Sequence, residues 1–496
     1  MPGVTVDPRS PVIVGVGQHV HRPDNPDGIE PLDLMAEAVR AAAADAGLAG
    51  VPSAVDSLRV VSLLSWRYGN PAMLLAERMA VTASEMAYTP AGGNAPQSLV
   101  NRTALDIASG LADLVVLTGA EAWRTRMRGR KAGTILDWPK APEDSVPTVI
   151  GEELEMTHPA EAARGVYLPV QMYPLFDTAI RAATGATPDD HLATIAALWS
   201  RFSEVAVTNP HAWTQTAMSA AQVAEVTPQN RLIGFPYRKV MNSNNDVDMG
   251  AAIIMCSAER AQQLGVARDR WVFPHSGTDC HEHVYVSNRM SFSDTPAIRL
   301  GGQRALDLAG VGIDDISIVD LYSCFPSAVQ LGAASLGLGL DRQLTRTGGL
   351  SFAGGPWNNY VMHAIATVVG ELRDYPGERG LVWANGGYVT KHAFGVYSTE
   401  PPAGGFRYDY PQDAIDALPN RAVATGDDAA GPADVEAYTV MFNRDGSPEQ
   451  AIASCLLGDG RRAWATSGES DVTTALLDGE WVGRRVVVSP AGQLLI

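Results

Sequence analysis

The sequence predicts an α/β protein made of two similar halves, each a mixed sheet with helices, to which a loop domain and a small β-rich C-terminal domain are added. Apolar runs of strand length alternate with helical patterns in the first quarter of the chain, and the same alternation returns from Gly302. After Ser398 the pattern changes to short apolar runs separated by glycine-containing turns. With 496 residues, 46% of them hydrophobic and 19% charged, the chain has apolar material for several domains.

The first half opens on a β-branched run, Val12–Val16, which predicts a strand. A helix is expected at Pro31–Ala46, because apolar residues recur at helical spacing and Gly47 stands where a C-cap belongs. Strands and helices that alternate in this way favour a parallel or mixed sheet with helices on both faces. Further strands are expected at Val55–Leu64, Met86–Thr89 and Leu114–Thr118, and further helices at Pro71–Ala80 and Ala95–Ser109.

The second half repeats the alternation. Its segment GIDDISIVDLYSCF (Gly312–Phe325) shares a glycine, an acidic residue, an apolar strand and a turn with GLADLVVLTGAEA (Gly110–Ala122). This similarity indicates an internal duplication, and chance similarity between two α/β units is the alternative. Helices are expected at Gly302–Ala309, Pro326–Leu338 and Asn359–Leu372, and strands at Ile316–Leu321 and Leu381–Ala384.

Two regions depart from this pattern. Residues 123–236 are rich in proline, contain a separate helical piece at Asp190–Phe202 and predict an inserted loop domain. The segment TEPPAGG after Ser398 is typical of a linker, and the short strands beyond it suggest a small barrel or sandwich. The expected domains are residues 1–122 with 237–265, then 123–236, 266–398 and 399–496. The strands of the last domain are expected at Ala437–Phe442, Ala451–Leu457, Arg462–Thr466 and Arg484–Val488.

Charge and cysteine content exclude several classes of protein. The net charge of −18 argues against nucleic acid or an anionic membrane surface as the main partner, because both require basic faces. Four cysteines without a CxxC pair form neither a disulfide framework nor a zinc motif, and favour a reducing compartment. No leader-like or membrane-spanning run is evident, so we expect a cytoplasmic protein.

The segment from Thr89 to Ala122, TPAGGNAPQSLVNRTALDIASGLADLVVLTGAEA, resembles the nucleophile region of thiolases. In that family a cysteine stands at a strand-to-helix turn, where the helix N-terminus lowers the pKa of the thiol. Here the turn is kept, but Gly93 occupies the cysteine position. The resemblance therefore implies a thiolase site without its nucleophile.

Three further thiolase motifs occur in order with altered side chains. Tyr322-Ser323-Cys324-Phe325 stands for the NEAF or HDCF motif, and Gly355 replaces the histidine of the GHP motif. Ala384-Asn385-Gly386-Gly387 stands for the CxG motif without its cysteine. The resemblance covers about residues 10–398 and is closest to thiolase-like proteins of type 1, which carry an additional C-terminal domain and lack the usual catalytic residues. It implies a thiolase fold with a small OB-like domain.

The resemblance implies an acyl-CoA-binding protein that is similar to acetyl-CoA acetyltransferases without their ordinary turnover. One alternative is a retro-aldol or acyl-transfer enzyme that uses Tyr322, with Tyr360 as a second candidate. Packing tyrosines in a vestigial site are the simpler interpretation of both. Another alternative is a scaffold that contacts a protein partner through its C-terminal domain. We expect no resident cofactor and no metal, and a monomer or a dimer.

A basic run provides a candidate site for the phosphates of coenzyme A, because guanidinium groups pair with phosphate oxygens and the rest of the chain is acidic. A solvated cationic loop is the alternative. Ser98 is interpreted as a surface or packing residue, and the polar types in Cys280–His283 are too crowded for a metal site without remote ligands. The expected ligand-binding residues are Arg124, Arg126, Arg128, Arg130 and Lys131, with Asn94, Asn385 and Gly386 at the motif turns.

Overall fold

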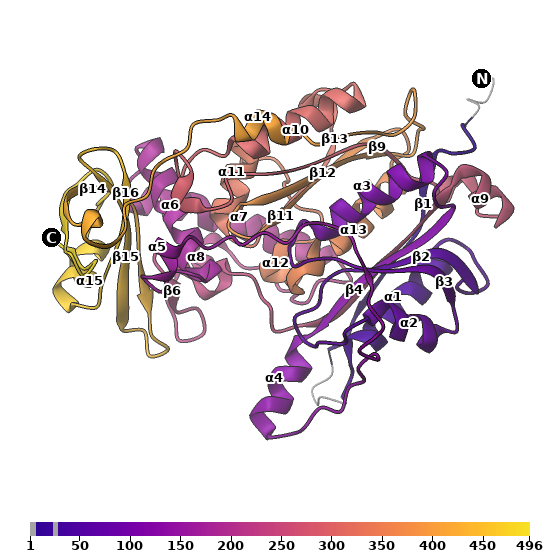
Figure 1. Cartoon of the computed structure of the whole chain (residues 1–496), viewed down its shortest axis with the longest axis horizontal. Helices are drawn as coiled ribbons and strands as arrows, with labels where there is room; N and C mark the ends of the chain where they lie inside the picture. The colour runs from indigo at the N-terminus through magenta and orange to yellow at the C-terminus, as the bar shows by residue number, and fades with distance from the viewer. Residues whose placement is uncertain (1–5, 23–27) are drawn as a thin grey trace.

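The computed structural model of the chain describes residues 6–22 and 28–496, and Figure 1 shows its two large sheets. The first has the strand order β1-β8-β4-β2-β3-β5 and the second the order β10-β11-β12-β9-β13. The expected α/β class is confirmed. The first sheet consists of β1 (Pro11–Val20), β2 (Ala54–Val60), β3 (Thr82–Tyr88), β4 (Leu114–Ala122), β5 (Thr148–Val149) and β8 (Asp248–Ser257), and the second of β9 (Phe273–His281), β10 (Ile318–Leu321), β11 (Arg379–Gly386), β12 (Lys391–Ser398) and β13 (Arg407–Asp409).

The two sheets repeat one arrangement. β1 is antiparallel to β8, β8 is antiparallel to β4, and β4 is parallel to β2. β9, β12, β11 and β10 repeat these directions in the same order. The halves are therefore similar, but β4 corresponds in position to β11. The sequence comparison of Gly110–Ala122 with Gly312–Phe325 paired β4 with β10, because both strands follow a glycine and an acidic residue.

Five layers result from the way the helices pack. α3 and α13 lie between the sheets and contact strands of both, α1 and α2 cover the outer face of the first sheet, and α10 and α11 cover that of the second. Most positions of α3 and α13 are buried, as a middle layer requires. The bounds are α1 (Pro31–Asp45), α2 (Pro71–Met79), α3 (Ala95–Ala108), α10 (Pro296–Ala309), α11 (Pro326–Leu336) and α13 (Tyr360–Asp374).

Two glycines allow α1 to pack closely on β1. A Cβ at Gly15 would lie 2.2 Å from the carbonyl oxygen of Ala42, and one at Gly17 would lie 2.1 Å from that of Ala38. Neither position has room for a side chain, because the obstacle is helix backbone. This glycine pair therefore serves helix–strand packing.

The inserted region is mainly helical and extends from the end of β4 to the start of β8. Its basic run forms a helix, α4, which corrects the expectation of a loop; Gly133 ends this helix with a φ of 70°. Figure 1 shows α4 projecting below the first sheet. The bounds are α4 (Trp123–Ala132), α5 (Pro159–Ala162), α6 (Pro169–Thr184), α7 (Pro188–Thr208), α8 (Ala220–Ala224), β6 (Leu232–Gly234) and β7 (Tyr237–Arg238).

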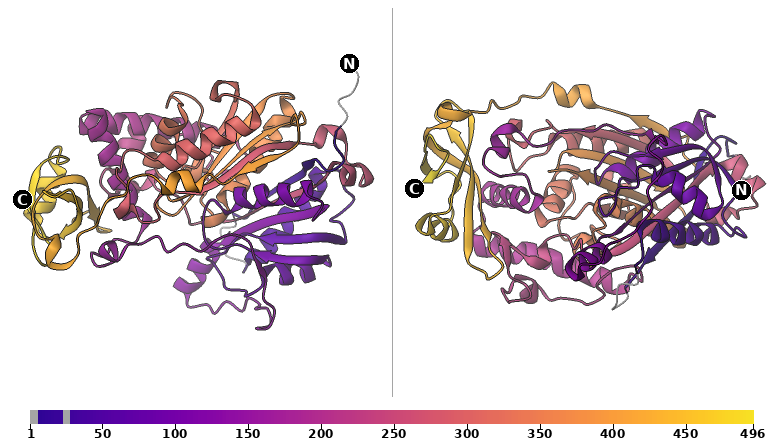
Figure 2. Two further views of the ribbon diagram at one scale, coloured as in Figure 1. Left: turned by 45° about the horizontal axis from the view of Figure 1, so that its top comes forward. Right: turned by 60° about the horizontal axis from the view of Figure 1, so that its bottom comes forward.

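The C-terminal residues form a third sheet of order β16-β15-β14-β17-β18, at the opposite end of the molecule from the N-terminus (Figure 2). A backbone hydrogen bond of 3.1 Å from Thr466 N in β16 to Gly492 O, just before β18, joins the two edges of the sheet and curls it toward closure. The expected β-rich character is confirmed, with one helix added. The bounds are β14 (Gly431–Phe442), β15 (Pro448–Leu457), β16 (Arg462–Ser467), α15 (Ser470–Leu477), β17 (Arg485–Val488) and β18 (Leu494–Leu495).

Two sets of contacts attach this sheet to the rest of the chain. β6 pairs with β14, and Phe235 N donates to Val440 O at 2.9 Å. Arg462, which is fully buried, donates to the carbonyl oxygens of Val286, Ser287 and Arg289 at 3.0, 2.7 and 2.7 Å. These contacts fix the added sheet to the inserted region and to the second half.

The other elements are short connections. They are the helices α9 (Ala258–Gln263), α12 (Gly349–Phe352) and α14 (Gln412–Asp416), and 3-10 turns at Lys239–Met241, Arg268–Arg270, Val286–Asn288, Ile313–Asp315, Trp357–Asn359 and Gly426–Ala429. Across residues 6–22 and 28–496, no helix combines the length and the apolar character that crossing a membrane requires.

Candidate functional site

The candidate site lies where the N-terminus of α3 meets the loops that follow β10 and β11. The turn that enters α3 carries Gly93, the position of the expected nucleophile. A Cβ on Gly93 would lie 2.4 Å from the hydroxyl oxygen of Tyr322 and 2.4 Å from the carbonyl oxygen of Asn385. The phenol of Tyr322 therefore occupies the space in front of the helix N-terminus that a side chain at position 93 would need.

Tyr322 is held by aromatic packing inside the protein. Its side chain is 7% exposed, and its ring meets that of Tyr360 edge to face, with centroids 5.7 Å apart. Burial raises the pKa of Tyr322 well above its usual value near 10, and Cys324 and Tyr360 raise it further. Tyr322 is consequently a neutral phenol, which can donate a hydrogen bond to an acyl oxygen but does not supply a phenolate base.

We expect the titration of Tyr322 to show this directly. Since the neutral phenol is favoured in the folded state, Tyr322 remains protonated through the pH range around 10 in which exposed tyrosines ionise. A pH titration of phenolate absorbance should give the same curve for the native protein and Tyr322→Phe up to about pH 10. A difference equivalent to one phenol below that pH would contradict the burial argument.

Tyr360 belongs to a buried polar network. Its hydroxyl pairs with the hydroxyl of Thr347 at 2.6 Å, and Thr347 pairs with Thr345 at 3.3 Å. Thr345 donates to Asp320, whose pKa burial raises to about 6. These contacts give Tyr360 the geometry of a support that positions the ring of Tyr322.

The other motif positions are closely packed by their neighbours. A Cβ at Gly355 would lie 2.1 Å from Ser243 Oγ, so the expected histidine position is closed by its neighbours. Asn385 donates to the Tyr173 hydroxyl at 3.0 Å, while its buried Oδ1 has no partner among the residues that the structure describes. A Cβ at Gly386 would lie 2.6 Å from Asn94 Oδ1. The structure thus brings Tyr322, Asn385 and Gly386 together around Gly93.

The basic residues of α4 differ in their surroundings: some contact the rest of the protein, and others are exposed. Arg124 pairs with Asp246 at 2.8 Å and lies over the ring of Trp213, whose backbone N–H donates to Ala353 O at 2.9 Å, beside Gly355. Arg126 donates to Leu64 O at 2.7 Å. Arg130 and Lys131 are exposed at the C-terminal turn of α4, where their charge stabilises the helix dipole. Within the basic run, Arg124 is therefore linked through Trp213 to the segment that carries Gly355.

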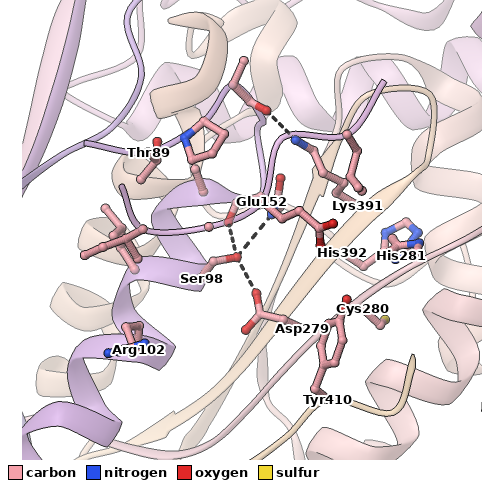
Figure 3. Close-up of a pocket in the computed structure, with 18 of the residues that line it drawn as sticks. Thr89, Ser98, Arg102, Glu152, Asp279, Cys280, His281, Lys391, His392 and Tyr410 are labelled. Carbon is pink, nitrogen blue, oxygen red and sulfur yellow. Dashed lines mark hydrogen bonds between the residues drawn. The ribbon is translucent and has the colours of Figure 1, made fainter. Parts of the chain in front are cut away.

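A separate pocket of about 530 Å³ lies on the other side of the α3 turn (Figure 3). Ser98 donates to Asp279 there, and Lys391 donates to Ala91 O. Burial raises the pKa of Asp279 and lowers that of Lys391. The sequence interpretation of Ser98 as a packing residue did not find this pocket, because the three segments that form it are far apart in the chain.

Two minor candidates have structural roles. His363 Nδ1 contacts Gln18 Oε1 at 2.9 Å, and burial lowers the pKa of this histidine to about 3. In Cys280–His283 the side chains diverge: Cys280 Sγ approaches Ala297 O, and His283 contacts Pro419 O at 3.2 Å. No cluster of three metal-ligating side chains occurs in the part of the chain that the structure describes.

Comparison with known proteins gives three informative similarities. The family model of the thiolase-like protein type 1 additional C-terminal domain matches residues 411–493. The structure of a monomeric SCP2-thiolase-like protein type 1 from Mycobacterium smegmatis is 32% identical, with a TM-score of 0.83 over 98% of both chains. An Ltp2–ChsH2(DUF35) aldolase is 20% identical, with a TM-score of 0.58 over 79% of this chain and 98% of its own, which shows the fold alone.

A curated relative is more distant. Benzoylsuccinyl-CoA thiolase subunit BbsB from Thauera aromatica is 23% identical over 234 residues, which are 47% of this chain. The match spans about half of that relative, 52% of its length.

Proposed function

The chain belongs to the SCP2-thiolase-like proteins of type 1, and from this premise we propose that it binds an acyl-CoA thioester at the α3 turn without carrying out ordinary thiolysis. The observation that carries the proposal is the pairing of Gly93 with Tyr322. The helix N-terminus that would stabilise a thiolate faces a neutral phenol instead.

The cysteines of the chain support the absence of a sulfur nucleophile. Cys324 lies in the loop of Tyr322, but burial raises its pKa to about 12, so its thiol is protonated at neutral pH. Cys256 and Cys455 also have pKa values raised to about 12 by burial, and burial raises the pKa of Cys280 well above its usual value. Thiolysis requires an attacking thiolate, and none of these thiols supplies one.

The experiment combines turnover with binding. Acetoacetyl-CoA and CoA are incubated with the protein, and loss of the substrate is followed by its absorbance, while calorimetry measures binding of acetyl-CoA. We expect binding without turnover above the buffer rate. Cleavage at the rates typical of enzymes would contradict the proposal that the protein lacks thiolysis. Absence of binding would contradict the proposal that its ligand is an acyl-CoA thioester.

Charge reversal on α4 tests the phosphate part of the ligand. The triple variant Arg126→Glu, Arg128→Glu and Arg130→Glu should weaken CoA binding about tenfold or more at low salt, because charge-assisted contacts to phosphate are lost. Arg444→Glu, an exposed change in the C-terminal domain, is the matched control and should leave the affinity unchanged. Calorimetry with CoA and with pantetheine, which lacks the nucleotide phosphates, separates the two parts. Equal CoA affinity in the native and triple-variant proteins would mean that the phosphates of CoA do not bind these arginines of α4.

A second candidate function is retro-aldol or acyl-transfer chemistry on a CoA thioester, with Tyr322 as the acid. The neutral phenol at the helix N-terminus favours this alternative, since a protonated donor can stabilise charge that develops on an acyl oxygen. Tyr322→Phe should then lower kcat on an aldol-type CoA substrate by a factor of about 100 or more. Tyr360→Phe is the comparison, and its effect should be smaller if Tyr360 only supports the ring. Unchanged turnover in Tyr322→Phe would remove Tyr322 as the acid.

A further inference from the structure

The pocket in Figure 3 is assembled from three walls that meet beside the α3 turn. One wall is a stripe of α3. A second is the paired ends of β9 and β12, where His281 stands opposite Lys391 and Asp279 stands opposite Ala393. The third is formed by the segment after β5 and by the chain after β13. The α3 stripe consists of Ala95, Ser98, Leu99, Arg102 and Leu105, and Asn94 continues it just before the helix.

The polar groups of the pocket differ in how much of their hydrogen-bonding capacity is used within the protein. Asp279 accepts hydrogen bonds from Ser98, from Asn101 at 2.8 Å and from Tyr408, so its acceptor capacity is largely used. Lys391 is 7% exposed, and its ammonium donates to Ala91 O. An ammonium has three donors, so Lys391 keeps donor capacity that a ligand oxygen could use.

Beside the polar end of the pocket, Gly92 leaves room for the polar atoms of two neighbouring side chains because it has no side chain of its own. The point where a Cβ on Gly92 would stand lies 2.4 Å from Asn94 Oδ1 and 2.8 Å from Lys391 Nζ. Asn94 Oδ1 is buried and has no hydrogen-bond partner among the residues that the structure describes. A buried acceptor without a partner costs free energy, which a donor such as a bound water molecule would recover. A donor with spare capacity and an unsatisfied acceptor thus lie on the same side of the turn.

The rest of the pocket is mainly apolar. Leu99 and Leu105 on α3 lie across the pocket from the apolar side chains Ile150 and Leu154. A volume of about 530 Å³ lies within the range of sites that enclose small organic ligands. The walls therefore fit an apolar body, and the only buried cation at the polar end among the described lining residues is Lys391.

We propose that this pocket is a second binding site, separate from the Tyr322 centre, for a carboxylic acid with an apolar body. The carboxylate lies beside Lys391, at the polar end, where it accepts a hydrogen bond from the ammonium. The apolar body lies along α3 between Leu99 and Leu154. An acyl group of a thioester shares the apolar body and the carbonyl oxygen, so the ligand is either a free acid or the acyl part of a CoA ester.

Calorimetry with decanoate tests the site on the full chain. Lys391→Met, which removes the ammonium and keeps the stem, should weaken decanoate binding about tenfold or more. Leu154→Trp, which fills the pocket from a loop rather than from the core, should weaken it by a similar factor. Lys140→Met applies the same chemical change at an exposed lysine and should bind as the native protein does. Circular dichroism confirms that each variant is folded.

A second arm distinguishes the two sources and keeps the site separate from the proposed function. If Lys391→Met and Leu154→Trp weaken the binding of decanoyl-CoA and leave the binding of CoA unchanged, the ligand is the acyl part of a thioester. If they weaken the binding of decanoate alone, the ligand is a free acid. Either result supports the site. Native binding of both ligands in both variants, or no binding of either ligand to the native protein, would overturn it. CoA binding measured in the same samples tests the α3 turn independently.

Discussion

Replacement of Arg462 by methionine is expected to lower the free energy of unfolding by about 3–5 kcal/mol. The guanidinium of Arg462 is fully buried and donates to three backbone carbonyls, on Val286, Ser287 and Arg289. It also forms an ion pair with Glu436 at 2.6 Å. Methionine fills part of the volume but leaves three acceptors and a largely buried carboxylate without partners.

The effect should be local as well as global. Because these bonds join the C-terminal sheet to the second half, hydrogen exchange in β16 and in the 286–289 turn should accelerate more than in β4. Arg461→Met is the matched control: Arg461 is partly exposed, pairs with Asp459 on its own turn and should change stability by no more than about 0.5 kcal/mol. Urea unfolding measures both variants. An equally small effect at Arg462 would show that the carbonyls find other donors.

Alanine at position 93 is expected to have the second large effect, a loss of about 1–3 kcal/mol or more through overpacking. Its Cβ would lie 2.4 Å from the Tyr322 hydroxyl, which can move, and 2.4 Å from the Asn385 carbonyl, which is backbone. The ring of Tyr322 would have to leave its place against Tyr360. Near-ultraviolet circular dichroism should therefore change together with stability.

A double-mutant cycle separates the phenol from the backbone. Tyr322→Ala alone opens a cavity, and Gly93→Ala combined with Tyr322→Ala should cost less than the sum of the single changes by about 0.5–3 kcal/mol. Tyr322→Ala should relieve only part of the destabilisation caused by Gly93→Ala, because the new Cβ would still clash with the Asn385 carbonyl oxygen. Gly458→Ala, at a glycine whose Cβ would meet nothing within 4 Å, is the control for the glycine-to-alanine change itself. Additive effects in the cycle would mean that Tyr322 does not occupy the space in front of position 93.

Much of the fold was predictable because strands and helices with one buried face leave periodic patterns. The strands β9 and β12 were missed, and for β9 the reason is physical. β9, FPHSGTDCH, buries polar side chains by hydrogen bonding them: Ser276 donates to Ala305 O and Thr278 donates to Gly301 O. A pattern of regularly spaced hydrophobic residues does not predict a strand whose buried side chains are polar. The helix at α4 was missed because its charged residues suggested a loop, whereas its half-buried arginines place their guanidinium groups over aromatic rings.

The order of the motifs at the candidate site could be predicted from the sequence, but the side chains that fill the site could not. Motif order placed Gly93, Tyr322, Gly355 and Asn385 in one family framework, and the structure brings Gly93, Tyr322 and Asn385 together. That a phenol from the loop after β10 fills the place of the missing side chain depends on distances between segments more than 200 residues apart. The buried lysine at Lys391 was equally hidden, because a charged residue in a sequence is ordinarily interpreted as solvated.

The strand β6 has a consequence for how such a protein could be shortened. A chain ending near Ser398 would retain β6 and Phe235 but would remove β14, leaving an unpaired strand edge and an aromatic ring in water. The truncated product would be prone to self-association even though its two halves were intact. Gain or loss of the C-terminal segment in related genes should therefore be accompanied by changes around residues 232–238, so that the two stretches evolve as a pair.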